Sequence, residues 1–186
     1  MSMIFKFRVL IADDDEFIRD YELPYDATLT DFHKLITRDL KFEDNDMASF
    51  FESNDEWEKL QEYTLIDMDV EDYEDDDDAF VPIPMDDMTL GKIMRSKHQR
   101  LIYVYDILND SSLFITLMES KKAKEGEKYP KVATSKGKAP KKLKDEDDII
   151  ARKSAYNDIM DDFDDEFDAD EFGDEFGSFE EEDYYS

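Results

Sequence analysis

Few residue types in this chain are suited to chemistry. It has two histidines, His33 and His98, and no cysteine in 186 residues, which excludes thiol nucleophiles, disulfides and thiolate metal sites. No nucleophile stands beside a base in a GxSxG or HExxH pattern, and the five glycines form no phosphate-binding loop. We therefore predict no catalytic residue and no cofactor. Carboxylates remain as the abundant reactive groups.

Asp106 and Asp110 are the two aspartates within the most apolar stretch of the chain, residues 101–120. To act as a general acid or base, they need a cleft in which burial raises the carboxyl pKa. An enzyme with a carboxylate-based site is therefore one alternative. Without such a cleft, these aspartates and the neighbouring Tyr105 are candidates for binding a protein partner, with Tyr105 in the core or lining a groove.

Acid-rich runs raise the question of a calcium site. A calcium-binding EF-hand loop supplies oxygen ligands at positions 1, 3, 5 and 12 around a glycine at position 6. The nearest match starts at Asp168 and has Asp170 and Gly173 in place, but Phe172 and Phe179 stand where ligands are required. We therefore predict no dedicated metal site.

The element that must position Tyr105 and the two aspartates is a β-hairpin over residues 101–120. Two apolar runs, 101–108 and 113–118, flank Asn109-Asp110-Ser111-Ser112, whose short polar side chains favour a turn. Strand alternation places apolar side chains on both faces of this hairpin, so neither face suits water. We expect the hairpin to lie at the centre of its sheet.

Hydrophobic periodicity predicts the remaining elements. The main helix is expected to begin after Thr28, an N-cap residue that is followed by Asp31 three positions later. Strands are expected over residues 3–11, 16–23, 47–51 and 63–68, and a short helix over residues 88–94. The predicted fold class is α+β, a mixed, largely antiparallel sheet with a central hairpin and a packed main helix.

Charge divides the chain into three parts. We expect an α+β domain over residues 1–120, a lysine-rich linker over residues 121–144, and an acidic aromatic C-terminal segment, partly helical or disordered, over residues 145–186. The chain has 52 acidic and 23 basic residues, and its net charge of −29 repels phosphate backbones and anionic lipids. We therefore expect no direct binding to nucleic acid or membranes, and a basic protein as the partner.

The location of the protein is predicted from what the sequence lacks. Its N-terminal residues show no signal-peptide pattern, and no stretch approaches the ~18 consecutive apolar residues that span a bilayer. A chain without cysteine is also compatible with a reducing compartment. We expect a cytoplasmic protein, and the sequence assigns no oligomeric state.

Of the five phenylalanines in the acidic C-terminal segment, four stand out: Phe163, Phe167, Phe172 and Phe176. They are candidate partner-binding residues that anchor an acidic peptide on a groove of the folded domain or on another protein. The alternative is a disordered segment that keeps the protein soluble.

Several motifs together resemble a known family. Thr28-Leu29, followed by Asp31-Phe32-His33 and Ile36, is similar to the TLxDLHxxIQ signature of the Ri-plasmid ORF-three-like family, whose members include insertion-element passenger proteins labelled as resolvase-like. Residues 101–106 resemble its LxYxYDFGD strand, and Tyr129-Pro130 with Gly137, Ala139 and Pro140 resembles its YPxCxxGxxAxPPED segment. The resemblance covers residues 3–140 and indicates a branch with an acidic C-terminal tail.

This resemblance implies an α+β domain and brings no established activity. The glycine, tryptophan and histidine of the family's FGDxWxH motif are absent from residues 107–112. Our first hypothesis is a non-enzymatic protein-interaction module associated with a mobile element. The alternatives are an acidic mimic of nucleic acid that binds a DNA-binding protein, and the carboxylate-based enzyme described above.

Overall fold

The computed structural model describes residues 2–42, 47–66 and 81–141. These residues form an eight-stranded sheet with the strand order β5-β4-β3-β6-β7-β1-β2-β8. The strands are β1 Met3–Ile11, β2 Asp14–Pro24, β3 Ser49–Ser53, β4 Lys59–Thr64, β5 Ile83–Pro84, β6 Arg100–Asp106, β7 Ser111–Lys122 and β8 Lys131–Lys136. All pairings are antiparallel except that of β4 with β5. The predicted α+β class is confirmed.

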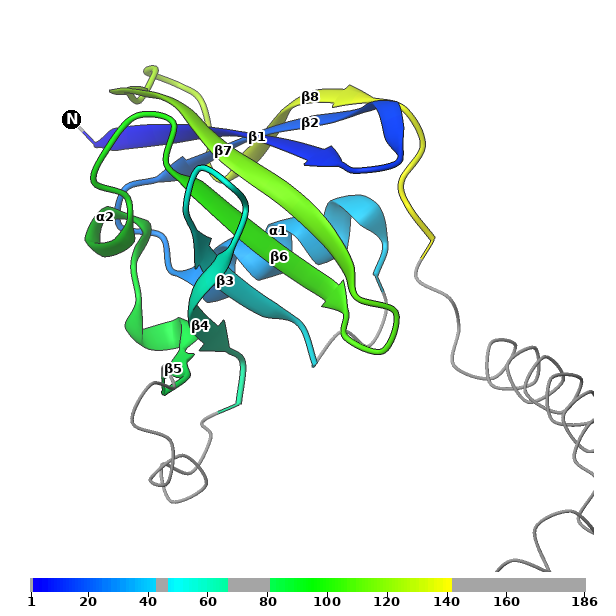
Figure 1. Ribbon diagram of the computed structural model, residues 1–186. Helices are drawn as coiled ribbons and strands as arrows, with labels where there is room; N and C mark the ends of the chain where they lie inside the picture. The colour runs from blue at the N-terminus through cyan, green and yellow to red at the C-terminus, as the bar shows by residue number, and fades with distance from the viewer. Residues whose placement is uncertain (1, 43–46, 67–80, 142–186) are drawn as a thin grey trace, which may run out of the picture. The chain divides into compact units, whose positions relative to one another are not determined.

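Helix α1, Leu29–Leu40, lies across one face of the curved sheet (Figure 1). It begins where the sequence predicts, because Thr28 and Asp31 form a capping box in which each side chain accepts a hydrogen bond from the other residue's backbone N–H. Its apolar stripe is buried: Leu29, Phe32, Leu35, Ile36 and Leu40. A shorter helix, α2, spans Leu90–Ile93 and follows a 3-10 turn at Met85–Asp87.

Aromatic side chains join α1 to the sheet. The ring centroid of Phe32 lies 5.0 Å from that of Phe7 and 5.4 Å from that of Phe50. Phe50 in turn lies 4.8 Å from Tyr103 on the central strand β6. Burial of each such side chain stabilises the fold by roughly 1.5–3 kcal/mol, so this cluster fixes the helix against β1, β3 and β6.

The hairpin of β6 and β7 occupies the middle of the sheet, as the sequence predicts. Its turn, however, is shifted. The strand ends at Asp106, whose carboxylate accepts hydrogen bonds from the backbone and side-chain nitrogens of Asn109. Ile107 and Leu108, expected within the strand, therefore lie in the turn, and Leu108 is 80% exposed.

The second hairpin, of β3 and β4, also differs in its bounds from the predicted strands over residues 47–51 and 63–68. Its loop returns over the hairpin of β6 and β7, where the ring of Trp57 packs 5.0 Å from Phe114 and beneath the guanidinium of Arg100 at 4.6 Å. This cover explains how Ile102, which lies between Phe51 and Phe114 in the register, is buried on the face opposite α1.

The structure describes residues 121–141 of the lysine-rich stretch expected to be a linker over residues 121–144, and two parts of them lie in the folded sheet. Strand β7 continues to Lys122, and β8 pairs with β2. The compact unit runs from Met1 to Lys142, so the expected boundary at residue 120 falls inside a strand. Gly126 and Pro130 lie in the turn between β7 and β8, and Gly137 and Pro140 follow β8, so these residues do not exclude a strand between them.

Buried charges hold β8 and β7 to β2. Glu22 on β2 is 3% exposed and pairs with Lys121, and with Lys131 at 3.4 Å. Asp20, 1% exposed, accepts two hydrogen bonds of 2.9 Å from Arg8. Two of the lysines in the predicted linker, Lys121 and Lys131, thus neutralise a buried carboxylate. Without them Glu22 would be an unpaired buried charge, which is strongly destabilising.

Candidate functional site

The structure places two of the predicted site residues on one pocket. Tyr105 and Asp110 both line a cavity of about 440 Å³ at the end of the sheet, between the β1–β2 and β6–β7 turns, which we call the hairpin-end pocket. Asp106 is absent from its lining because it caps the turn through Asn109. Two of the predicted residues therefore share a pocket, whereas Asp106 serves the turn beside it.

The groups at this pocket are engaged in structural contacts. The ring of Tyr105 is buried and stacks on Phe42 at 4.6 Å, and its burial raises the pKa of its hydroxyl. The carboxylate of Asp110 pairs with the Lys59 ammonium at 3.0 Å, and its side chain is 81% exposed. Asp110 therefore lacks the burial that a carboxylate-based enzyme requires.

The four phenylalanines proposed as anchors, Phe163, Phe167, Phe172 and Phe176, lie outside the described residues. The calcium-like stretch that starts at Asp168 also lies outside them. Within residues 2–42, 47–66 and 81–141, no group of three or more His, Asp or Glu side chains is placed to hold a metal ion. The same part of the chain contains no helix of the length and apolarity needed to cross a bilayer.

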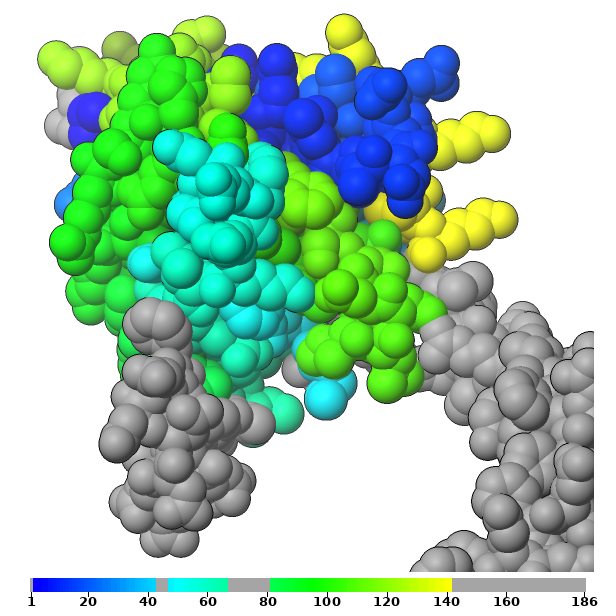
Figure 2. Space-filling view, in the orientation of Figure 1, coloured from blue at the N-terminus to red at the C-terminus, as the bar shows by residue number. Residues whose placement is uncertain are grey.

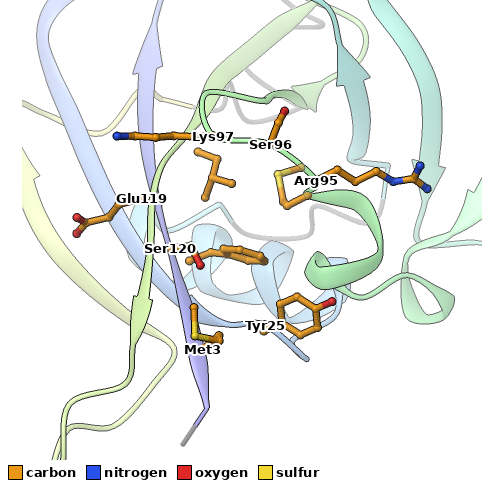
Figure 3. Close-up of a pocket in the computed structure, with 10 residues that line it drawn as sticks. Met3, Tyr25, Arg95, Ser96, Lys97, Glu119 and Ser120 are labelled. Carbon is orange, nitrogen blue, oxygen red and sulfur yellow. The ribbon is translucent and has the colours of Figure 1, made fainter.

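A second cavity, which sequence reasoning missed, is mostly apolar. It has a volume of about 430 Å³ and opens to solvent between β1, β7 and the segment after α2; we call it the apolar pocket (Figure 3). Its lining is Met3, Phe5, Tyr25, Met94, Arg95, Ser96, Lys97, Leu117, Glu119 and Ser120. Phe5, Met94 and Leu117 are buried, whereas Met3 is 39% and Tyr25 49% exposed.

The charged side chains stand at the rim of the apolar pocket. In Figure 3 the ends of Lys97, Glu119 and Arg95 point away from its centre. Met3, Tyr25 and Ser120 lie around the hollow in the same view. An apolar group that enters the pocket therefore meets thioether, aromatic and aliphatic atoms, with charges of both signs outside.

A fixed loop builds one wall of this pocket. The side-chain amide of Gln99 donates a hydrogen bond of 2.9 Å to the backbone carbonyl of Ile93 and accepts one of 2.8 Å from the backbone N–H of Arg95. The loop is also tied to β7, since the N–H of His98 donates to the carbonyl of Leu117 and the N–H of Leu117 to that of Gln99. These hydrogen bonds fix the wall of the pocket through contacts of the chain with itself.

Tyr25 forms the opposite wall. Its hydroxyl donates to the carbonyl of Gly91 at 3.2 Å, and its ring lies 5.6 Å from Phe5. A Cβ atom at position 91 would stand 2.2 Å from the Tyr25 ring, so only glycine allows this close approach. Gly91 is the one signal in the sequence that marks this wall, and without the structure nothing connects it to Tyr25.

His33, one of the two histidines, takes part in the core. It is 8% exposed, and its Nδ1 lies 2.8 Å from the hydroxyl of Tyr103. On the other side of α1, the carboxylate of Asp39 accepts from the Tyr21 hydroxyl at 2.8 Å and pairs with Arg19 at 3.1 Å. Burial, and then the bond to Asp39, raise the pKa of Tyr21 far above its ordinary value. These polar groups fix α1 to the sheet.

This protein is an α+β domain, because it combines a sheet of mostly antiparallel strands with one main helix. It also has an open apolar pocket. The chain belongs to the plasmid pRiA4b ORF-3-like protein family, whose family model matches residues 3–175. The family resemblance inferred from the motifs is therefore confirmed.

A solved structure shares the fold. It is the crystal structure of a protein of unknown function, MM3350 from Methanosarcina mazei Go1, which is 19% identical and has a TM-score of 0.57. The match covers 73% of this chain and 70% of that one. None of the curated proteins compared with this chain matches it. The likeness concerns the fold alone.

Proposed function

We propose that this protein is a non-enzymatic protein-interaction module that receives an apolar side chain of its partner in the apolar pocket. The observation that carries the proposal is an open cavity with a partly exposed methionine and a partly exposed tyrosine among its lining residues, Met3 and Tyr25. Exposed apolar atoms within a polar rim are typical of ligand and protein contacts. Two methionines in the lining, Met3 and Met94, also suit side chains of varied shape.

The lining of the apolar pocket favours binding over catalysis. Its hydroxyl groups belong to Ser96, Ser120 and Tyr25, and no histidine is among the lining residues. A serine nucleophile needs an adjacent base to be activated. The hydroxyl of Tyr25 donates a hydrogen bond to the backbone carbonyl of Gly91, and this bond holds the tyrosine in the wall of the pocket.

The charge of the described residues bears on the alternative of an acidic nucleic-acid mimic. They carry twenty-one acidic and nineteen basic side chains, whereas the whole chain carries 52 and 23. The described surface is therefore close to neutral, and mimicry of a phosphate backbone gains no support from it.

We extend the proposal to a mobile-element association, since the family takes its name from a plasmid reading frame.

Selection of peptides on the full-length protein tests the proposal. Peptides enriched from a random display library are expected to share an apolar residue, and their dissociation constants are then measured by calorimetry. Ser120→Trp and Ser96→Trp place an indole into the apolar pocket from exposed positions and should weaken binding at least tenfold.

Lys34→Trp is the matched control, because Lys34 is exposed on α1 and absent from the lining of the pocket. It should leave the dissociation constant unchanged. Peptides that bind the two pocket-filling variants as tightly as the unmodified protein, or a library that yields no enriched peptide, would refute the proposal.

A further inference from the structure

Strand β8 is an edge of the sheet. It pairs with β2 on one side, and in the part of the chain that the structure describes no strand pairs with its other side. Such an edge presents backbone N–H and C=O groups that an extended segment of another protein can pair with. Four of its six residues are exposed, so the described domain leaves the strand open to solvent.

Lysines without an ion-pair partner among the described residues lie on β8 and directly after it. Lys131 is used within the domain, through Glu22 and Glu127. In contrast, Lys136, Lys138 and Lys141 form no ion pair with any described residue. Figure 2 shows long side chains of this region, in yellow, that project from the body of the domain. The edge therefore carries positive charge that no described residue neutralises through an ion pair.

We propose that the open edge of β8 binds an extended acidic segment of a partner protein, which adds to the sheet as a further strand. The register defines what this segment should look like. Lys131 and Lys136 pair with Glu22 and Ile18 on one face, whereas Val132 pairs with the core residue Tyr21 and is 36% exposed. A strand with carboxylates on the lysine face and an apolar side chain beside Val132 complements both faces.

The lysines also decide which strands are rejected. Lysine on an edge strand discourages pairing with neutral or basic strands, because its charge would be desolvated or repelled. A second copy of this chain is disfavoured for the same reason: symmetric antiparallel pairing of two β8 strands around positions 133 and 134 sets Lys131 against Lys136 of the other copy. Only an acidic strand converts these charges into attraction.

A synthetic octapeptide of alternating glutamate and valine is the probe, used with the full-length protein labelled with 15N. We expect saturable shifts of the backbone amides of residues 131–136, and a dissociation constant that rises with salt because the attraction is screened. The same peptide N-methylated at alternate backbone nitrogens keeps every charge but loses the donors of the ladder. It should bind at least tenfold more weakly, and equal binding would overturn strand addition.

Protein variants separate this edge from general electrostatics. Lys136→Glu with Lys138→Glu should weaken binding at least tenfold, whereas Lys34→Glu with Lys92→Glu, which changes net charge equally on the helices, should change it less than twofold. Equal losses in the two double variants would overturn the proposal. So would a single-stranded DNA oligonucleotide of the same charge that binds as tightly as the peptide and shifts the same amides.

Discussion

Glu22 explains, at the scale of single residues, why a lysine-rich stretch belongs to the folded unit. Burial alone raises the pKa of this carboxyl, but the hydrogen bond and charge of Lys121, with those of Lys131, outweigh burial and hold it below its ordinary value. Lys121 responds in the opposite direction, since its hydrogen bond to Glu22 raises the pKa of the ammonium. Both shifts favour the charged pair that joins β2 to β7 and β8.

The lowered pKa of Glu22 predicts how stability depends on pH. A carboxyl whose pKa is lower in the folded state stabilises the fold fully above the ordinary value of 4.5, and this contribution is lost as the pH falls through the folded pKa. We therefore expect the free energy of unfolding to decrease as the pH falls from about 5 to about 3. Urea unfolding at a series of pH values measures this free energy of unfolding.

Glu22→Gln should lower stability near neutral pH by about 1–3 kcal/mol and flatten the decrease in acid. Glu119→Gln is the control, because Glu119 is 48% exposed and lies 3.6 Å from the same Lys121. It should change the free energy of unfolding by less than about 0.5 kcal/mol. A Glu22→Gln protein with an unaltered pH profile would contradict this account of the buried charge.

Gly137, which follows β8, supports a second prediction at the residue scale. Its φ of +73° and a Cβ position 2.7 Å from the carbonyl oxygen of Glu16 both exclude a side chain. Gly126 has a similar φ of +82° but no atom within 4 Å of that position. Gly126→Ala should cost about 1 kcal/mol from the backbone alone, and Gly137→Ala clearly more. Equal losses of stability in urea unfolding would show that the close approach is relieved.

At the scale of elements, the two helices offer a matched test of capping. Thr28 accepts a hydrogen bond from Asp31 N–H at the start of α1, whereas Thr89, the N-cap of α2, forms no such bond with its side chain. Thr28→Ala should therefore destabilise the protein by about 1 kcal/mol. Thr89→Ala should lower the free energy of unfolding by only a few tenths of a kcal/mol, and urea unfolding measures both losses. A larger loss for Thr89→Ala than for Thr28→Ala would contradict the assignment of the cap.

Elements with a local cause could be predicted from the sequence. The capping residues and apolar stripe of α1 are visible within twelve residues, and the apolar runs of β6 and β7 mark a central hairpin. The position of the hairpin's turn depends on which polar side chain caps it. Composition favours the stretch after Leu108, but the carboxylate of Asp106 ends the strand earlier.

Strand β8 could not be predicted, because the residues that hold it in the sheet are far from it in the sequence. Its lysines and the nearby glycine resemble a linker when only neighbours are considered. Its partners, Asp20 and Glu22, precede it by more than a hundred positions and become buried only when it pairs. The apolar pocket has the same character, since its walls come from the starts or ends of several elements, and Tyr25 and Gly91 are unrelated in the sequence.

At the scale of the whole molecule, most of the net charge belongs to residues other than those that the structure describes. The net charge is −29, yet the described residues contribute little of it, because their acidic and basic side chains nearly balance. Several of these charges are paired across strands, as in Arg8 with Asp20 and Lys121 with Glu22. Total charge is thus a poor guide to the surface that the described residues present.

Truncation tests where the folded unit ends. A protein of residues 1–142 retains β8 and the lysines that neutralise Glu22, whereas one of residues 1–120 retains Glu22 without Lys121 or Lys131. Loss of the partners of a buried charge costs about 3–5 kcal/mol, which is a large share of the stability of a domain this size. We expect residues 1–142 to unfold cooperatively in urea and residues 1–120 to be largely unfolded without denaturant. A cooperative transition of residues 1–120 at a similar urea concentration would place the boundary at residue 120 and remove β8 from the structural unit.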